Sequence, residues 1–233
     1  MPTNPNNPAD GWLSRSRAAA QRTELGPGTE QIGRVMEVGD GIALVSGLPT
    51  AKLDELLRFE NGQLGFAQVL ERDYVGCVLF DDLDEIEAGH TVRGLGDVVR
   101  VPVGSRLLGR IVDPLGRPLD GKGPIEAESR EPIERPAPEI IDRDLVTEPV
   151  QTGWLVIDAL FALGRGQREL IVGDRATGKS IIAIDTIINQ KSTDIVCVYV
   201  AVGQKSSSVR RAIDAIQSFG ASDRCIIVVA ESS

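Results

Sequence analysis

The stretch Gly173-Asp174-Arg175-Ala176-Thr177-Gly178-Lys179-Ser180 decides how the C-terminal part of this 233-residue chain folds. It fits the pattern G-x-x-x-x-G-K-[ST], which wraps a loop around phosphate groups. The apolar run RELIVG (168–173) precedes it and the periodic run KSIIAIDTIINQK (179–191) follows it. These flanks predict a buried strand, a loop and a helix, and they make a glycine-rich turn without function the weaker interpretation.

Each residue type in this stretch has a physical role in binding a nucleoside triphosphate. Gly173 and Gly178 let the backbone approach phosphate oxygens closely, while successive N–H groups and the helix N-terminus direct partial positive charge at the anion. Lys179 is expected to reach the β- and γ-phosphates, and the Ser180 hydroxyl to coordinate Mg²⁺. We therefore predict that ATP or ADP, with Mg²⁺, binds to Gly173, Asp174, Arg175, Ala176, Thr177, Gly178, Lys179 and Ser180.

Strands and helices alternate on both sides of this stretch. WLVIDALFAL (154–163) predicts a helix closed by Gly164, and SSVRRAIDAIQSFG (207–220) predicts another that ends at Gly220. The helix predicted at 207–220 keeps one apolar face. DIVCVYVAV (194–202) and CIIVVA (225–230) predict buried strands, so the pattern indicates βαβ units and a parallel sheet. The apolar face of the helix comprises Val209, Ile213, Ile216 and Phe219.

The N-terminal part of the chain has a different pattern. Residues 1–27 are predicted to form an arm, disordered at its Asn- and Pro-rich start, with a short helix at 12–24 that is either solvated or a docking element. Residues 28–97 are predicted to form a small antiparallel β-barrel or sandwich, because β-rich runs recur about every ten residues from about Thr29 to Val101. These runs are QIGRVMEV, IALVSGL, LGFAQVL, YVGCVLF and VVRVPV. Residues 98–233 are predicted to form the nucleotide domain, whose Pro-rich passage 124–149 is expected to run extended over a surface.

Composition narrows the possible functions. A net charge of −9 argues against a nucleic-acid partner, since such partners select clustered Lys and Arg. No uncharged apolar stretch approaches the length of a bilayer span, and the N-terminus lacks the apolar region of a secretory signal. The three cysteines lie in apolar runs and are predicted to be buried, reduced thiols, so we expect an intracellular, soluble protein. A single histidine, His90, leaves little basis for metal clusters or histidine-dependent triads.

Catalysis of phosphate cleavage requires a group that positions and activates water. Gln204 follows the strand next along the chain from the phosphate loop, and its amide can orient a water but cannot take its proton. Glu231 follows CIIVVA and is a candidate residue for the side of the site that holds Mg²⁺. The favoured interpretation is that it is an ordinary polar residue at a strand end.

These motifs resemble the alpha-subunit family of the rotary proton-translocating ATP synthase. GDRATGKS resembles that family's GDRQTGKT, and the similarity extends to VGDGIALVSGL, VPVGSRLLGRIVDPLGRPLDGKGPI and YVAVGQKSSSVRR, covering nearly all of residues 28–233. The catalytic beta subunit would instead show GGAGVGKT and a GER-type segment at Gly203-Gln204-Lys205. Glutamine in place of that glutamate is typical of the non-catalytic site.

The resemblance implies a six-stranded barrel followed by a RecA-like P-loop domain, with Gln204 at the nucleotide site. It implies a regulatory subunit that binds Mg-ATP without turnover and alternates with beta subunits around a gamma shaft, with peripheral-stalk subunits as further partners. Such a complex makes ATP from ADP and phosphate using a proton gradient, as a peripheral assembly on the cytoplasmic face of the bacterial inner membrane.

The chain departs from the family pattern at three places. Ala176 stands where glutamine is usual, Ser180 where threonine is usual, and the sequence stops at Ser233. The resemblance places the arginine finger, a magnesium-coordinating Asp and a helical domain beyond that residue, so we expect an incomplete RecA-like domain with a loose, association-prone sheet. Two alternatives stay open, namely a self-contained P-loop NTP hydrolase and a truncated fragment that serves only assembly.

Overall fold

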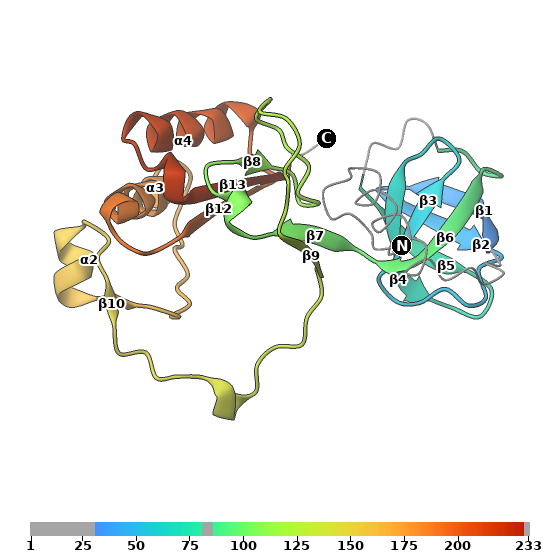
Figure 1. Ribbon diagram of the computed structural model, residues 1–233, viewed down its shortest axis with the longest axis horizontal. Helices are drawn as coiled ribbons and strands as arrows, with labels where there is room; N and C mark the ends of the chain where they lie inside the picture. Colours follow the sequence, from blue (N-terminus) through green and yellow to red (C-terminus); the bar gives the residue numbers. More distant parts are fainter. Residues whose placement is uncertain (1–30, 81–85, 231–233) are drawn as a thin grey trace, which may run out of the picture. The chain divides into compact units, whose positions relative to one another are not determined.

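The computed structural model describes residues 31–80 and 86–230, drawn in colour in Figure 1. Contacts divide the chain into two compact units, with the division between Asp97 and Val98. The predicted arm over residues 1–27 and the candidate Glu231 lie outside the described residues. Within the described residues, no helix is long and apolar enough to cross a membrane.

The first unit is a closed barrel of six strands, which confirms the predicted antiparallel barrel. Neighbouring strands follow the order β1-β2-β5-β4-β3-β6 around it. The strands are β1 (Ile32–Gly39), β2 (Ile42–Ser46), β3 (Glu55–Phe59), β4 (Leu64–Leu70), β5 (Val75–Leu79) and β6 (Thr91–Val98).

Local sequence explains how this barrel turns and what fills it. Asp40 and Gly41 both have positive φ, 50° and 79°, as a two-residue hairpin between β1 and β2 requires. The side chains of Val45, Leu57 and Val92 are fully buried and belong to one apolar cluster inside the barrel. Alternation of buried and exposed residues along the strands therefore places one face of each strand in the core.

Two details of the barrel differ from the sequence-based expectation. The run VVRVPV does not contribute a barrel strand of its own, because β7 (Arg100–Val103) pairs instead with β9 (Ser129–Pro132). The strands β3 and β6 were not among the predicted runs; the sequence of β3, ELLRF, carries Glu55 and Arg58 within a short run. Glu55 is nonetheless buried, and its carboxylate accepts hydrogen bonds from the backbone N–H groups of Lys52 and Gly96.

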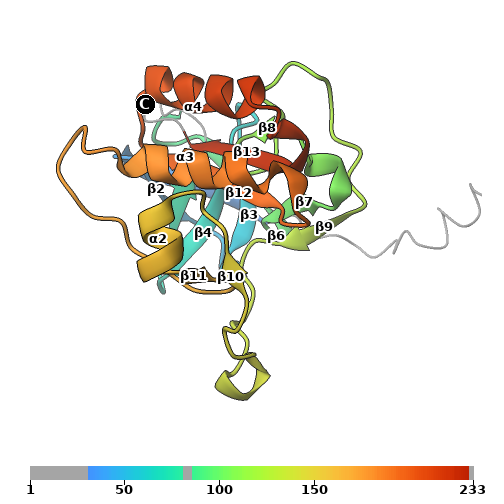
Figure 2. The same cartoon turned by 90° about the vertical axis from the view of Figure 1, so that its left-hand side faces the viewer.

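The second unit contains a three-stranded parallel sheet in the order β12-β13-β8, as Figures 1 and 2 show. Its strands are β8 (Ile111–Val112), β12 (Cys197–Val202) and β13 (Cys225–Ala230). Helices α3 (Lys179–Asn189) and α4 (Ser206–Ser218) both pack against the buried face of β12 and β13. The predicted parallel βαβ arrangement is therefore confirmed for β12, α4 and β13.

The apolar stripe of α4 explains why this helix covers the sheet. Val209, Ile213 and Ile216 are buried, while Phe219, predicted on the same face, is 60% exposed because the helix ends before it. Gly220 has φ of 71° and donates to the Gln217 carbonyl oxygen, which confirms it as the terminator.

Two predictions about the segment before the phosphate loop were wrong. RELIVG forms no strand: Leu170 and Val172 are 83% and 78% exposed. An apolar run becomes a strand only where a neighbour supplies hydrogen bonds, and none of the described strands pairs with it. Helix α2 spans only Leu155–Leu160, and Gly164 does not cap it but lies in β11 (Leu163–Gly164), paired with β10 (Pro149–Val150).

The Pro-rich passage runs extended, as predicted. Residues 133–149 are all exposed, and their only regular turn among the described residues is a short 3-10 helix at Ile140–Asp142.

Before this passage, the Arg110 guanidinium donates two hydrogen bonds to the Asp120 carboxylate, with distances of 2.6 and 3.0 Å. The Asp120 side chain is 3% exposed, and these bonds hold the pKa of that carboxyl well below its usual range.

The three cysteines are free thiols; Cys77 and Cys225 are buried, as predicted, whereas Cys197 is only partly buried. Cys77 lies in the barrel core, whereas Cys197 and Cys225 pair in register at the starts of β12 and β13. Burial raises the pKa of the Cys77 thiol to about 12 and that of Cys225 to about 11, so both favour the protonated, unreactive form.

Candidate nucleotide-binding site

Residues 173–178 of the phosphate-loop pattern form a loop, and Lys179 and Ser180 are the first two residues of α3. Gly178 is the N-cap residue of α3 and has φ of 91°, a conformation that favours glycine. Ala176 also has a positive φ, 62°, which an alanine adopts less readily. Residues 173–177 are exposed, so their backbone N–H groups are open to a ligand.

The Lys179 ammonium closes this loop on itself. Its Nζ donates to the Gly173 carbonyl oxygen at 2.6 Å and also to the carbonyl oxygen of Asp174. The Thr177 hydroxyl lies 3.4 Å from Nζ and donates to the Asp174 oxygen at 2.9 Å. Lys179 is therefore inside the loop, at the place from which an ammonium can exchange carbonyl oxygens for phosphate oxygens.

Glycine at position 173 is explained by close approach within the loop. A Cβ there would lie 3.0 Å from Thr177 Oγ1, which is tighter than an ordinary contact. Ser180 follows Lys179 in the first turn of α3 and is exposed. Its hydroxyl and the N-terminal N–H groups of α3 thus belong to the same helix end.

Gln204 lies just beyond the carboxyl end of β12. Its Oε1 accepts a hydrogen bond of 3.4 Å from the Tyr199 hydroxyl. None of the hydrogen bonds between described residues joins Gln204 to residues 173–180. Sequence reasoning missed Tyr199, whose only signal was a polar hydroxyl within an apolar strand, a group that finds a partner when buried.

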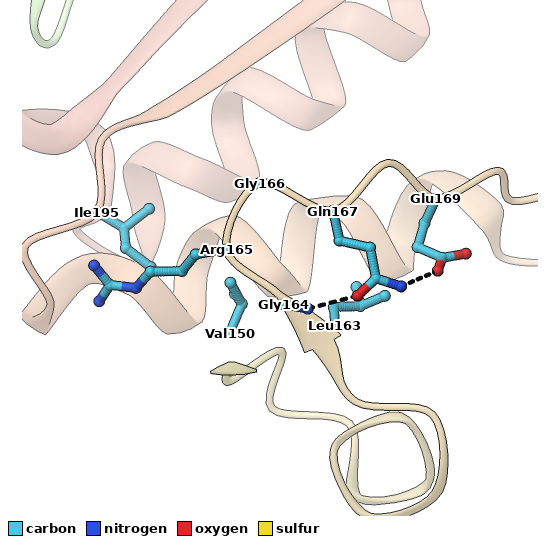
Figure 3. A pocket seen from close by; sticks show the side chains of 8 residues that line it. All are labelled: Val150, Leu163, Gly164, Arg165, Gly166, Gln167, Glu169 and Ile195. Atoms are coloured by element: carbon cyan, nitrogen blue, oxygen red, sulfur yellow. Dashed lines mark hydrogen bonds between the residues drawn. The ribbon is translucent and has the colours of Figure 1, made fainter. Parts of the chain in front are cut away.

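A concavity lies just upstream of the phosphate loop. Figure 3 shows its lining, which includes Arg165, Gln167 and Glu169. These polar groups are already engaged: Gln167 accepts from the Gly164 N–H at 2.8 Å and donates to Glu169.

Arg165 in that concavity is an anchor for the neighbouring chain segments. Its guanidinium lies 2.9 Å from an Asp194 carboxylate oxygen and 3.4 Å from one of Glu148. The hydrogen bond to Asp194 raises the pKa of Arg165 and lowers that of Asp194. The concavity is therefore a structural junction before β12, and the exposed phosphate loop is the better candidate for a ligand.

Each of the two units matches a domain of a known protein family. Residues 28–96 match the beta-barrel domain of the ATP synthase alpha/beta family, and residues 153–233 match the nucleotide-binding domain of the same family. Together these two matches cover most of the chain.

Curated relatives align along almost the whole chain. One is "ATP synthase subunit alpha 2" of Gluconobacter oxydans, 64% identical over 222 residues, covering 95% of this chain and 44% of the relative. Another is "ATP synthase subunit alpha 3" of Paraburkholderia xenovorans, 60% identical over 231 residues, which cover 99% of this chain and 44% of the relative. A third, "ATP synthase subunit alpha 2" of Burkholderia thailandensis, is 56% identical over an alignment that covers 95% of this chain and 40% of the relative. The chain spans less than half the length of each of these relatives.

Proposed function

The chain belongs to the ATP synthase alpha/beta family, and on this premise we propose that it is a regulatory, non-catalytic subunit of alpha type that binds Mg-ATP. The complex it serves makes ATP from ADP and phosphate using a transmembrane proton gradient. One observation carries the proposal most strongly: Lys179 is held inside an exposed phosphate loop that opens α3.

The proposed ligand set is the loop itself. Backbone N–H groups of residues 173–178 and the ammonium of Lys179 bind the phosphates of ATP or ADP, and Gln204 lies at the γ-phosphate end. The exposed Ser180 hydroxyl fits Mg²⁺, which is held by few protein oxygens together with phosphate oxygens and water. When bound, Mg²⁺ would neutralise charge on the β- and γ-phosphates.

The residue at the end of β12 favours binding over turnover. Gln204 offers a carboxamide, which orients a water molecule but does not accept its proton as a carboxylate can. A self-contained hydrolase would require another base, and the described residues place none at this strand end.

The proposed partners follow from the family. We propose that the chain alternates with beta subunits around a gamma shaft, contacts peripheral-stalk subunits, and lies peripherally on the cytoplasmic face of the bacterial inner membrane. We further propose a domain organisation of an arm at 1–27, a barrel at 28–97 and a RecA-like domain at 98–233. The bacterial relatives named as alpha subunits support this assignment.

Co-purification tests the subunit role. When an affinity-tagged form of this chain is co-expressed with an ATP synthase beta subunit, we expect the two to elute together at equal stoichiometry in a complex larger than either chain. The beta subunit passed alone over the same resin is the control. Elution of the tagged chain without beta, under conditions in which it binds nucleotide, would contradict the proposed assembly and leave a binding protein of another kind.

A further inference from the structure

Tyr199 joins the apolar core of the second unit to Gln204. Its ring lies in the middle of β12, in the buried cluster that also contains Ala201 and Ile227, and the residue is 9% exposed. Its hydroxyl reaches the strand end, where it donates to Gln204 Oε1 across 3.4 Å. A rigid, buried ring thus carries a single polar contact to a residue at the edge of the sheet.

This contact determines which end of the carboxamide is available. A glutamine side chain has one acceptor oxygen and one NH₂ group with two donors. Because the oxygen accepts from Tyr199, the NH₂ group of Gln204 is the end that remains for a ligand. An NH₂ donor attracts phosphate oxygens, whereas the amide oxygen would repel them.

The direction of the chain places Gln204 and the phosphate loop at the same edge of the sheet. Helix α3 has 11 residues, about 16 Å of length, and leads through a short 3-10 turn into the start of β12. Strand β12 then runs back for six residues, about 20 Å. The first turn of α3 and the carboxyl end of β12 therefore lie toward one edge, the edge at which parallel sheets bind ligands.

We propose that Tyr199 is a positioning residue that holds the Gln204 carboxamide with its NH₂ group toward the γ-phosphate, so that the site favours a nucleoside triphosphate over a diphosphate. The inference rests on the proposed function of the phosphate loop. A tyrosine that only fills the core would need its ring and not its hydroxyl, and this difference makes the two roles separable by experiment.

The test is the affinity of Tyr199→Phe for Mg-ATP and for Mg-ADP, measured by calorimetry on the full chain. The substitution keeps the buried ring and removes the hydroxyl. We expect Mg-ATP affinity to fall by about two- to tenfold, the range of one hydrogen bond, while Mg-ADP affinity stays unchanged. Tyr74→Phe, at the only other tyrosine of the chain, is the matched control and should change neither affinity.

A double-mutant cycle with Gln204→Ala completes the test. In the Gln204→Ala background, Tyr199→Phe should have no further effect, because the group that the hydroxyl positions is gone. An equal loss of Mg-ATP and Mg-ADP affinity, additive effects, or no effect of Tyr199→Phe would each overturn the inference. If Lys179→Ala abolishes binding while Tyr199→Phe leaves it intact, the inference alone fails. If the unmodified chain binds no Mg-ATP, the proposed function fails with it.

Discussion

Replacing Lys179 with alanine is expected to weaken Mg-ATP binding by about ten- to a hundredfold. The side chain supplies the cation that faces the loop interior, where it contacts the Gly173 carbonyl oxygen at 2.6 Å. A charge-assisted contact to phosphate is worth about 1.5–3 kcal/mol, and the substitution removes it while the backbone N–H groups remain. Titration calorimetry with Mg-ATP measures the effect directly.

Lys191→Ala is the matched control for this substitution. Lys191 lies in the 3-10 turn that follows α3, so its removal changes net charge equally without altering the loop. We expect its Mg-ATP affinity to equal that of the unmodified chain. Unchanged affinity in Lys179→Ala, or an equal loss in both variants, would show that the nucleotide does not bind in this loop.

Replacing Ile216 with alanine is expected to lower the free energy of unfolding of the second unit by about 2–5 kcal/mol. Ile216 is fully buried where α4 covers the sheet, so the substitution leaves a cavity lined by the residues around it. Hydrogen exchange followed by mass spectrometry resolves the effect by segment. Amides of β12 and β13 should exchange faster, while amides of β1 and β2 keep their protection.

Leu57→Ala provides the reciprocal change, because Leu57 is fully buried in the barrel. Here we expect faster exchange in the barrel strands and unchanged protection in β12 and β13. Leu53→Ala is the surface control, since that residue is 56% exposed. This substitution should change the free energy of unfolding little in either unit. Loss of protection across both units in either core variant would contradict the proposal that 28–97 and 98–233 fold as separate domains.

Much of the architecture could be predicted because it is encoded locally. The Asp40-Gly41 pair specifies a tight hairpin, since both residues adopt positive φ without a large steric cost. The i, i+4, i+7 spacing of Val209, Ile213 and Ile216 likewise fixes the buried face of α4 before any tertiary contact is known.

Features that depend on distant neighbours could not be predicted. RELIVG has the composition of a buried strand, yet pairing requires an adjacent strand, and Leu170 and Val172 are exposed where none lies beside them. Gly164 had the residue type of a helix terminator but is used in the short β10–β11 pair. The contact between Tyr199 and Gln204 depends on how a side chain leaves its strand, which sequence periodicity does not report.

The identity of the nucleotide recovered from the purified chain tests most directly whether this is a binding site without turnover. After equilibrium dialysis against labelled ATP and Mg²⁺, we expect one nucleotide per chain, recovered as ATP, with phosphate release no faster than in Lys179→Ala. Recovery of ADP together with phosphate release that depends on Lys179 would contradict the non-catalytic assignment. An absence of saturable binding would contradict the nucleotide site itself.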